Sequence, residues 1–135
     1  MSQNIVNIEG IGPAYGAKLV EVGLKNIDQL LDVGGTAKGR SALAAKTGIA
    51  EAHILRWVNH ADLMRINGVG PQFAELLEAA GVDTVKELRQ RNPANLAAQL
   101  TKINEQKKLT KGAVSESQIA GWIEQAKALD SKVSY

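Results

Sequence analysis

An internal repeat constrains this sequence more than any other feature. Residues 8–13, Ile-Glu-Gly-Ile-Gly-Pro, recur 58 positions later as residues 66–71, Ile-Asn-Gly-Val-Gly-Pro. The correspondence continues without a gap as far as Leu30 and Leu88, and it keeps the glycines, the proline and the apolar positions in the same order. Self-similarity of this kind indicates that one supersecondary unit has been duplicated in tandem.

A second match lies further along the chain, at a shift of 65 positions. Residues 49–57 correspond to residues 114–122, and each segment ends in a tryptophan, Trp57 or Trp122. Because both tryptophans fall on apolar stripes at helical spacing, we expect them to be core anchors. The larger shift makes the second copy seven residues longer than the first.

The two shifts also predict the domain organisation. A chain of 135 residues can form one compact domain or two very small ones. We expect a first helical unit at residues 1–62, a second at residues 63–130 and a frayed tail at residues 131–135.

Helix boundaries can be read from prolines, glycines and capping residues. Pro13 and Pro71 suit the first position of a helix, and Gly23 and Gly81, ten residues later, suit the position just beyond its end. The helix that carries Trp57 is expected to continue to residue 66. Side chains that can cap later helices are those of Asn26, Thr36, Thr84, Asn92 and Ser115. No segment alternates apolar and polar residues, so the sequence predicts an all-α fold without a sheet.

Composition excludes several classes of function. The chain has no cysteine, which rules out disulfides and Cys-ligated zinc, and no apolar run approaches the roughly 20 residues that span a bilayer. His53 and His60 lie seven residues apart without a clear carboxylate partner, and no nucleophile–base pair or phosphate-binding P-loop is present. We therefore expect a cytoplasmic protein that is not an enzyme, with no cofactor, no metal and no membrane association.

The repeated glycine motif is suited to binding an anion. In residues 10–13 two glycines flank a hydrophobic residue directly before a predicted helix. The amides of Gly10, Gly12, Ala14 and Tyr15 therefore lie at or near a helix N-terminus, where the positive end of the helix dipole favours a phosphate. The same reasoning applies to residues 68–73.

This Gly-hydrophobe-Gly-Pro motif, followed by a small residue and a leucine, resembles the helix-hairpin-helix family. Residues 8–31 are especially similar to the hairpins of X-family DNA polymerases, and the whole chain resembles an uncharacterised bacterial family of helix-hairpin-helix domains. The resemblance implies two tandem hairpin units packed as a compact helical domain. It also implies that the hairpin amides hold DNA phosphates without reading sequence, in some members with a monovalent cation on the hairpin carbonyls.

The two copies differ in the charged residues near their hairpins. The net charge is only +2, but residues 102–111 carry four lysines against one acid. The first copy has Lys18 in the helix after its hairpin, whereas the second has Glu75 and Glu78, so we expect the first hairpin to matter more. The candidate nucleic-acid-binding residues are Gly10, Ile11, Gly12, Ala14, Lys18, Gly68, Val69, Gly70, Gln72, Lys107, Lys108 and Lys111. The alternative is a protein-interaction or scaffold module in which the hairpins are purely structural.

Overall fold

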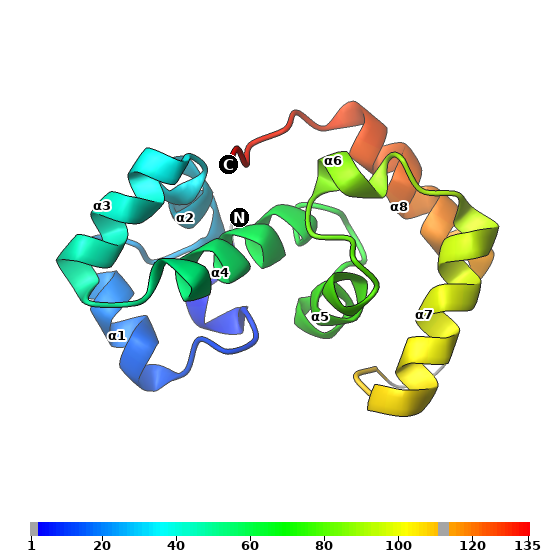
Figure 1. Cartoon of the computed structure of the whole chain (residues 1–135), viewed down its shortest axis with the longest axis horizontal. Helices are drawn as coiled ribbons and strands as arrows, with labels where there is room; N and C mark the ends of the chain where they lie inside the picture. The colour runs from blue at the N-terminus through cyan, green and yellow to red at the C-terminus, as the bar shows by residue number, and fades with distance from the viewer. Residues whose placement is uncertain (1–2, 111–113) are drawn as a thin grey trace. The chain divides into compact units, whose positions relative to one another are not determined.

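The computed structural model describes residues 3–110 and 114–135 of the chain. These residues form helices and no strand, which confirms the all-α prediction, apart from one isolated antiparallel bridge between Asn4 and Asn26. In chain order (Figure 1) the elements are the 3₁₀ helix η1 (Ile5–Asn7) and the α-helices α1 (Pro13–Glu21), α2 (Ile27–Gly34), α3 (Ala37–Thr47), α4 (Glu51–Leu63), α5 (Pro71–Ala79), α6 (Val85–Leu88), α7 (Pro93–Lys107) and α8 (Glu116–Ala128).

The chain forms two compact units. Unit 1 comprises Met1–Asp62 together with Lys132–Tyr135, and unit 2 comprises Leu63–Ser131. Within unit 1, α2 packs on α3 and η1 on α1, whereas within unit 2 helix α8 packs on α6 and α7, and α5 packs on α7. The elements of the two units correspond in order, with α1 and α5 both nine residues long and α4 and α8 both thirteen. The inserted residues lengthen α7 to fifteen residues, against eleven in α3.

The predicted capping residues begin their helices as expected. Ser115 and Gln118 form a complete capping box at the start of α8, in which each side chain accepts from the other residue's backbone N–H. Asn26 and Thr84 cap α2 and α6 at corresponding positions of the two units. Such caps satisfy backbone donors that have no partner inside the helix.

The predicted glycines end α1 and α5. Gly23 and Gly81 have φ of +92° and +85°, a left-handed conformation that glycine adopts without a steric penalty. The Leu24 N–H donates to the carbonyl of Leu19 with an N···O distance of 2.9 Å, and the equivalent bond in unit 2 is also 2.9 Å long. The repeat seen in the sequence is therefore a repeat of hydrogen-bond geometry.

The two tryptophans are core residues, as the sequence predicts. Trp57 is 2% exposed and Trp122 is 3% exposed. Trp57 contacts Tyr15 with ring centroids 5.1 Å apart, and Trp122 contacts Phe73 at 5.2 Å, with interplanar angles of 59° and 58°. Each unit is thus built around the same tilted aromatic pair between its Trp-bearing helix and the helix after its Gly-hydrophobe-Gly-Pro motif.

Helix α4 is shorter than the sequence predicts. It ends at Leu63 rather than continuing to Ile66, and the Ile66 N–H donates to the Leu63 carbonyl in a turn. Gly68, a few residues further on, takes a φ of +99°, and Ile66 is buried. Neither a capping residue nor a break in the apolar periodicity predicts that the helix ends at this position.

The C-terminal tail also differs from the prediction of a frayed end. Val133 is buried, and the Ser134 N–H donates to the carbonyl of Gly35 with an N···O distance of 2.8 Å. The buried Arg40 side chain donates to the Ser134 carbonyl at 2.6 Å and also to the carbonyls of Gly34 and Gly35. Arg40 therefore joins the end of α2 to a segment nearly a hundred residues away, and a single arginine in a helix gives no sign of such a partner.

Candidate nucleic-acid interface

Each unit presents a Gly-hydrophobe-Gly-Pro loop, which we name the first GxGP loop (residues 10–13) and the second GxGP loop (residues 68–71). In both loops the hydrophobic residue, Ile11 or Val69, is buried and anchors the loop to its unit. The Ile11 N–H donates to the carbonyl three residues earlier at 3.2 Å, and the equivalent bond of Val69 is 3.1 Å long. These two candidate residues therefore hold the loop in place, because neither their side chains nor their amides are open to a ligand.

The first glycine of each loop is required by the fold. Gly10 and Gly68 have φ of +91° and +99°. A Cβ atom on Gly10 would lie 3.4 Å from Nε1 of Trp57, and one on Gly68 would lie 3.0 Å from Nε1 of Trp122. Backbone conformation and the underlying indole therefore both favour glycine at these positions.

The second glycine of each loop has a different role. Gly12 and Gly70 are the N-cap residues of α1 and α5, with extended backbone and no atom within 4 Å of the position that a Cβ would take. Neither helix receives a side-chain cap, whereas η1, α2, α3, α6, α7 and α8 are all capped by a side chain. The first-turn amides of α1 and α5 are thus left without the partner that these other helix starts have.

Lys18 lies on the same face of α1 as the loop amide of Ala14. The two residues are four positions apart, and helical side chains lean toward the N-terminus, so an exposed lysine at position 18 points back toward Ala14. In unit 2 the equivalent residue is Leu76, which is buried. The cationic reach toward the loop therefore exists on α1 and not on α5.

Arg56 is a further cationic residue at the first GxGP loop. Its Nη1 atom lies 4.0 Å from the Cβ position that a side chain on Gly10 would take. Sequence reasoning missed it, because it lies on α4, far along the chain. A comparison of the two copies could have pointed to it, because the residue before the shared tryptophan is Arg56 in the first copy and Gly121 in the second.

A shallow hollow of about 330 Å³ adjoins the first GxGP loop and is lined by residues 6–12. Glu9 is half-buried in this hollow and brings one carboxylate close to the loop. Gly10 and Gly12 are exposed at its edge, as is Ala14 just beyond. The glycine backbone is therefore accessible to a ligand from solvent.

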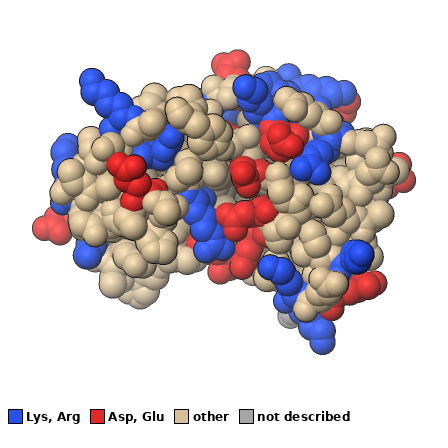
Figure 2. All heavy atoms as spheres, viewed as in Figure 1, with Lys and Arg blue, Asp and Glu red and all other residues tan. Residues whose placement is uncertain are grey.

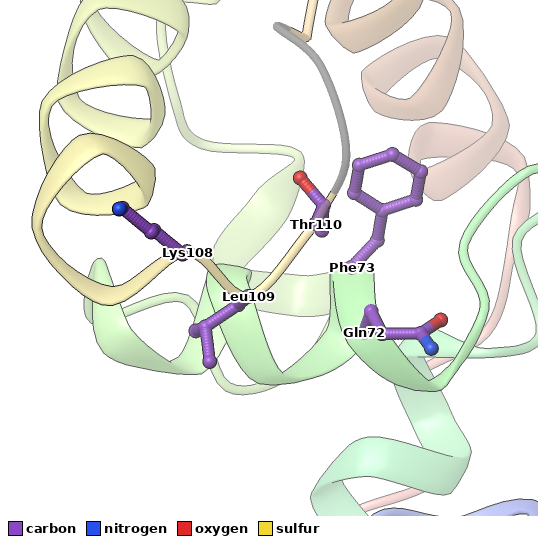
Figure 3. A pocket seen from close by; sticks show the side chains of 5 residues that line it. All are labelled: Gln72, Phe73, Lys108, Leu109 and Thr110. Atoms are coloured by element: carbon purple, nitrogen blue, oxygen red, sulfur yellow. The ribbon is translucent and has the colours of Figure 1, made fainter.

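The second GxGP loop has a different neighbourhood. Helix α7 ends at Lys107, and the left-handed Lys108 begins a segment that runs alongside the start of α5. Gln72 and Phe73 of α5 and residues 108–110 line a pocket of about 430 Å³ (Figure 3). The structure thus brings the predicted residues Gln72 and Lys108 together in unit 2, while Lys111 lies outside the described residues.

The lysines of the inserted region are exposed. Lys102, Lys107 and Lys108 all face solvent, with Glu105 among them. Figure 2 shows basic side chains gathered at the C-terminal end of α7. All three lysines belong to unit 2, and Lys108 is the one that the structure places next to the start of α5, which follows the second GxGP loop.

The two histidines do not form a shared site. His60 is buried, and His53 stacks on Trp57 with ring centroids 6.0 Å apart. Within residues 3–110 and 114–135, no three acidic or histidine side chains converge as metal ligands would. No helix in the same part of the chain combines the length and apolarity that membrane crossing needs.

Fold and site together define an all-helical protein of two compact units, each with one GxGP loop directly before a helix that has no side-chain cap. The chain belongs to the family described as a domain of unknown function, DUF4332, whose match covers residues 9–129. No curated protein and no solved structure matches the chain.

Proposed function

We propose that this protein is a tandem helix-hairpin-helix protein that binds nucleic acid through phosphates, without sequence specificity. The observation that carries the proposal is the contrast among helix starts. The two helices that follow GxGP loops lack a side-chain cap, and the other starts with a described cap have one. Uncapped amides at the positive end of a helix dipole are suited to a phosphate oxygen.

The first GxGP loop is the main contact in this proposal. Lys18 and Arg56 flank it, and cations beside backbone amides add charge attraction to the hydrogen bonds. No protein atom lies within 4 Å of the position that a Cβ on Gly12 would take. Because glycine leaves this space empty, a nucleic-acid strand can approach the backbone there. Phosphate contacts of this kind position a protein on a duplex and carry no sequence information.

The test is a titration of a labelled DNA duplex with the full chain at two salt concentrations. With about three to five phosphate contacts, the slope of log K against log salt should be roughly −3 to −4.5. Lys18→Glu should weaken binding to unrelated duplex sequences equally. Lys38→Glu is the matched control, because Lys38 is an exposed lysine of unit 1 on the first turn of α3.

Two results would overturn the proposal. One is a dissociation constant for duplex weaker than about 10⁻⁴ M at low salt, which lies below the usual non-specific range. The other is an equal loss of affinity in the Lys18 and Lys38 variants, which would show a general charge effect without a defined site. Either outcome would favour the alternative, a protein-interaction module with structural loops.

A further inference from the structure

The pocket beside α5 is built with a segment that the first copy of the repeat lacks. Its far wall is the segment 108–110, which follows the part of α7 that the seven-residue insertion lengthens. In unit 1 the corresponding helix α3 ends at Thr47, and residues 48–50 lead directly into α4. The insertion has therefore added a concave surface beside a GxGP loop, and the volume of about 430 Å³ lies within the range of small-molecule sites.

The wall of this pocket is held in a fixed position. The Asn104 side chain accepts from the Thr110 N–H at 3.0 Å and donates to the Thr110 carbonyl at 3.2 Å. Thr110 lines the pocket, yet its hydroxyl oxygen is buried and has no hydrogen-bond partner. An unsatisfied buried hydroxyl costs free energy, so a ligand group that reached the Thr110 hydroxyl would give it the hydrogen-bond partner that the protein does not supply.

The lining combines a flat apolar surface with neutral hydrogen-bonding groups. Phe73 is half-buried, with Trp122 packed against it, and Leu109 lies on the opposite segment (Figure 3). Gln72 is exposed at the start of α5 and offers both a donor and an acceptor. Lys108 is the one cation among these five lining residues.

The negative charge of α5 favours an uncharged ligand in the pocket. This helix carries two carboxylates, Glu75 and Glu78, and no cation. Neither carboxylate lines the pocket, but negative charge on this helix opposes a phosphate bound beside it and does not oppose an uncharged ring. An uncharged heteroaromatic base fits the phenyl ring, the Gln72 amide and the Thr110 hydroxyl, while Lys108 can meet the phosphate that follows the base.

We propose that this pocket holds an unpaired base of a single-stranded nucleic acid. The inference rests on the proposed function and adds a second binding mode to it, in which unit 2 contacts a base where unit 1 contacts phosphates. It assigns Gln72, Phe73, Lys108, Leu109 and Thr110 as base-site residues. A protein of this kind would bind strands with unpaired nucleotides more tightly than fully paired duplex.

The test compares a short single-stranded oligonucleotide, the same strand made of abasic nucleotides, and the matching duplex. The abasic strand keeps every phosphate and lacks the bases, so it isolates the base contribution. Wild-type protein should bind the normal strand at least about fivefold more tightly than the abasic strand, as expected for one stacked base. A free mononucleotide serves as a fourth ligand and shows whether the base alone suffices without a strand.

Two conservative variants locate the effect. Thr110→Val replaces the hydroxyl by a methyl group, and Gln72→Ala removes the side-chain amide; both should reduce the preference for the normal strand and leave duplex affinity unchanged. Lys102→Asn is the control for Lys108→Asn, since Lys102 is an exposed lysine on α7 that does not line the pocket. Asparagine tolerates the left-handed backbone of position 108, so this variant should fold.

The two proposals fail in different ways. Equal binding of normal and abasic strands, with duplex still bound in a Lys18-dependent manner, would overturn the base pocket alone. Failure to bind any of the four ligands would overturn the proposed function and the base pocket with it. A preference for the normal strand that is undiminished in both the Thr110 and Gln72 variants would also overturn the pocket assignment.

Discussion

Replacing the two glycines of one loop separately tests the division of roles within the GxGP motif. Gly68→Ala forces a side chain into a backbone with φ of +99° and places its Cβ 3.0 Å from Nε1 of Trp122. A left-handed conformation costs an L-residue about 1–2 kcal/mol, and the close contact adds to it. In the opposite direction, alanine lowers the conformational entropy of the unfolded chain, which stabilises the folded protein by about 0.4–1 kcal/mol. We expect a net loss of about 1–2 kcal/mol.

Gly70→Ala is the matched control. Gly70 has φ of −92°, and a Cβ there meets nothing within 4 Å. Alanine caps a helix somewhat less well than glycine, but the gain from the unfolded chain offsets this, so the net change should stay within about 0.5 kcal/mol. Gly10 and Gly12 of the first loop should repeat the contrast, with a smaller loss at Gly10, because the contact with Trp57 there is 3.4 Å.

Urea denaturation followed by tryptophan fluorescence measures both variants, since each unit contains one tryptophan beneath its loop. In thermal denaturation, a loss of 1 kcal/mol in a unit of the length of unit 2 lowers its Tm by about 4–8 °C. Equal stability of the Gly68 and Gly70 variants would refute the reasoning, as would a larger loss at Gly70. Either result would mean that the loop conformation is not what requires glycine at position 68.

Two further predictions concern burial. Trp57→Ala and Trp122→Ala should each destabilise the protein by about 3–5 kcal/mol, since both indoles are almost fully buried. Chemical denaturation measures this loss, and a loss below about 1 kcal/mol would contradict the assignment of the tryptophans to the core. Arg40→Met removes the donor to the Ser134 carbonyl and should release the C-terminal segment. The Ser134 amide should then exchange with solvent much faster than in wild type. Unchanged protection of this amide would show that the other contacts are enough to hold the segment.

Local features of this chain were predictable because they depend on neighbours in sequence. Pro13 begins α1, Gly23 follows its end, and Ser115 caps α8, in each case because a single residue type satisfies the backbone of one turn. The repeat added a second, independent reading of each element. The local rules failed at the end of α4, which stops at Leu63 although no capping residue or break in periodicity marks that position, and Ile66 beyond it is buried.

The candidate site divides in the same manner. The GxGP loops were visible in the sequence as anion-binding candidates, but their buried Ile11 and Val69 proved to be anchors. Arg56 was missed, and Lys108 was placed beside the second loop only by the fold. Both depend on which helix packs near which loop, and composition does not report that.

The all-helical class, the recurring glycine motif and most helix starts follow from the amino-acid order alone, because hydrogen bonding within one turn and the limits on φ act over a few residues. Three other features required the folded chain: the tail from Lys132 to Tyr135 joins unit 1, each tryptophan lies under a loop glycine, and Thr110 meets Phe73 at a pocket. Those contacts join residues far apart in the chain, and they are selected by the burial and packing of whole helices, which no local pattern encodes.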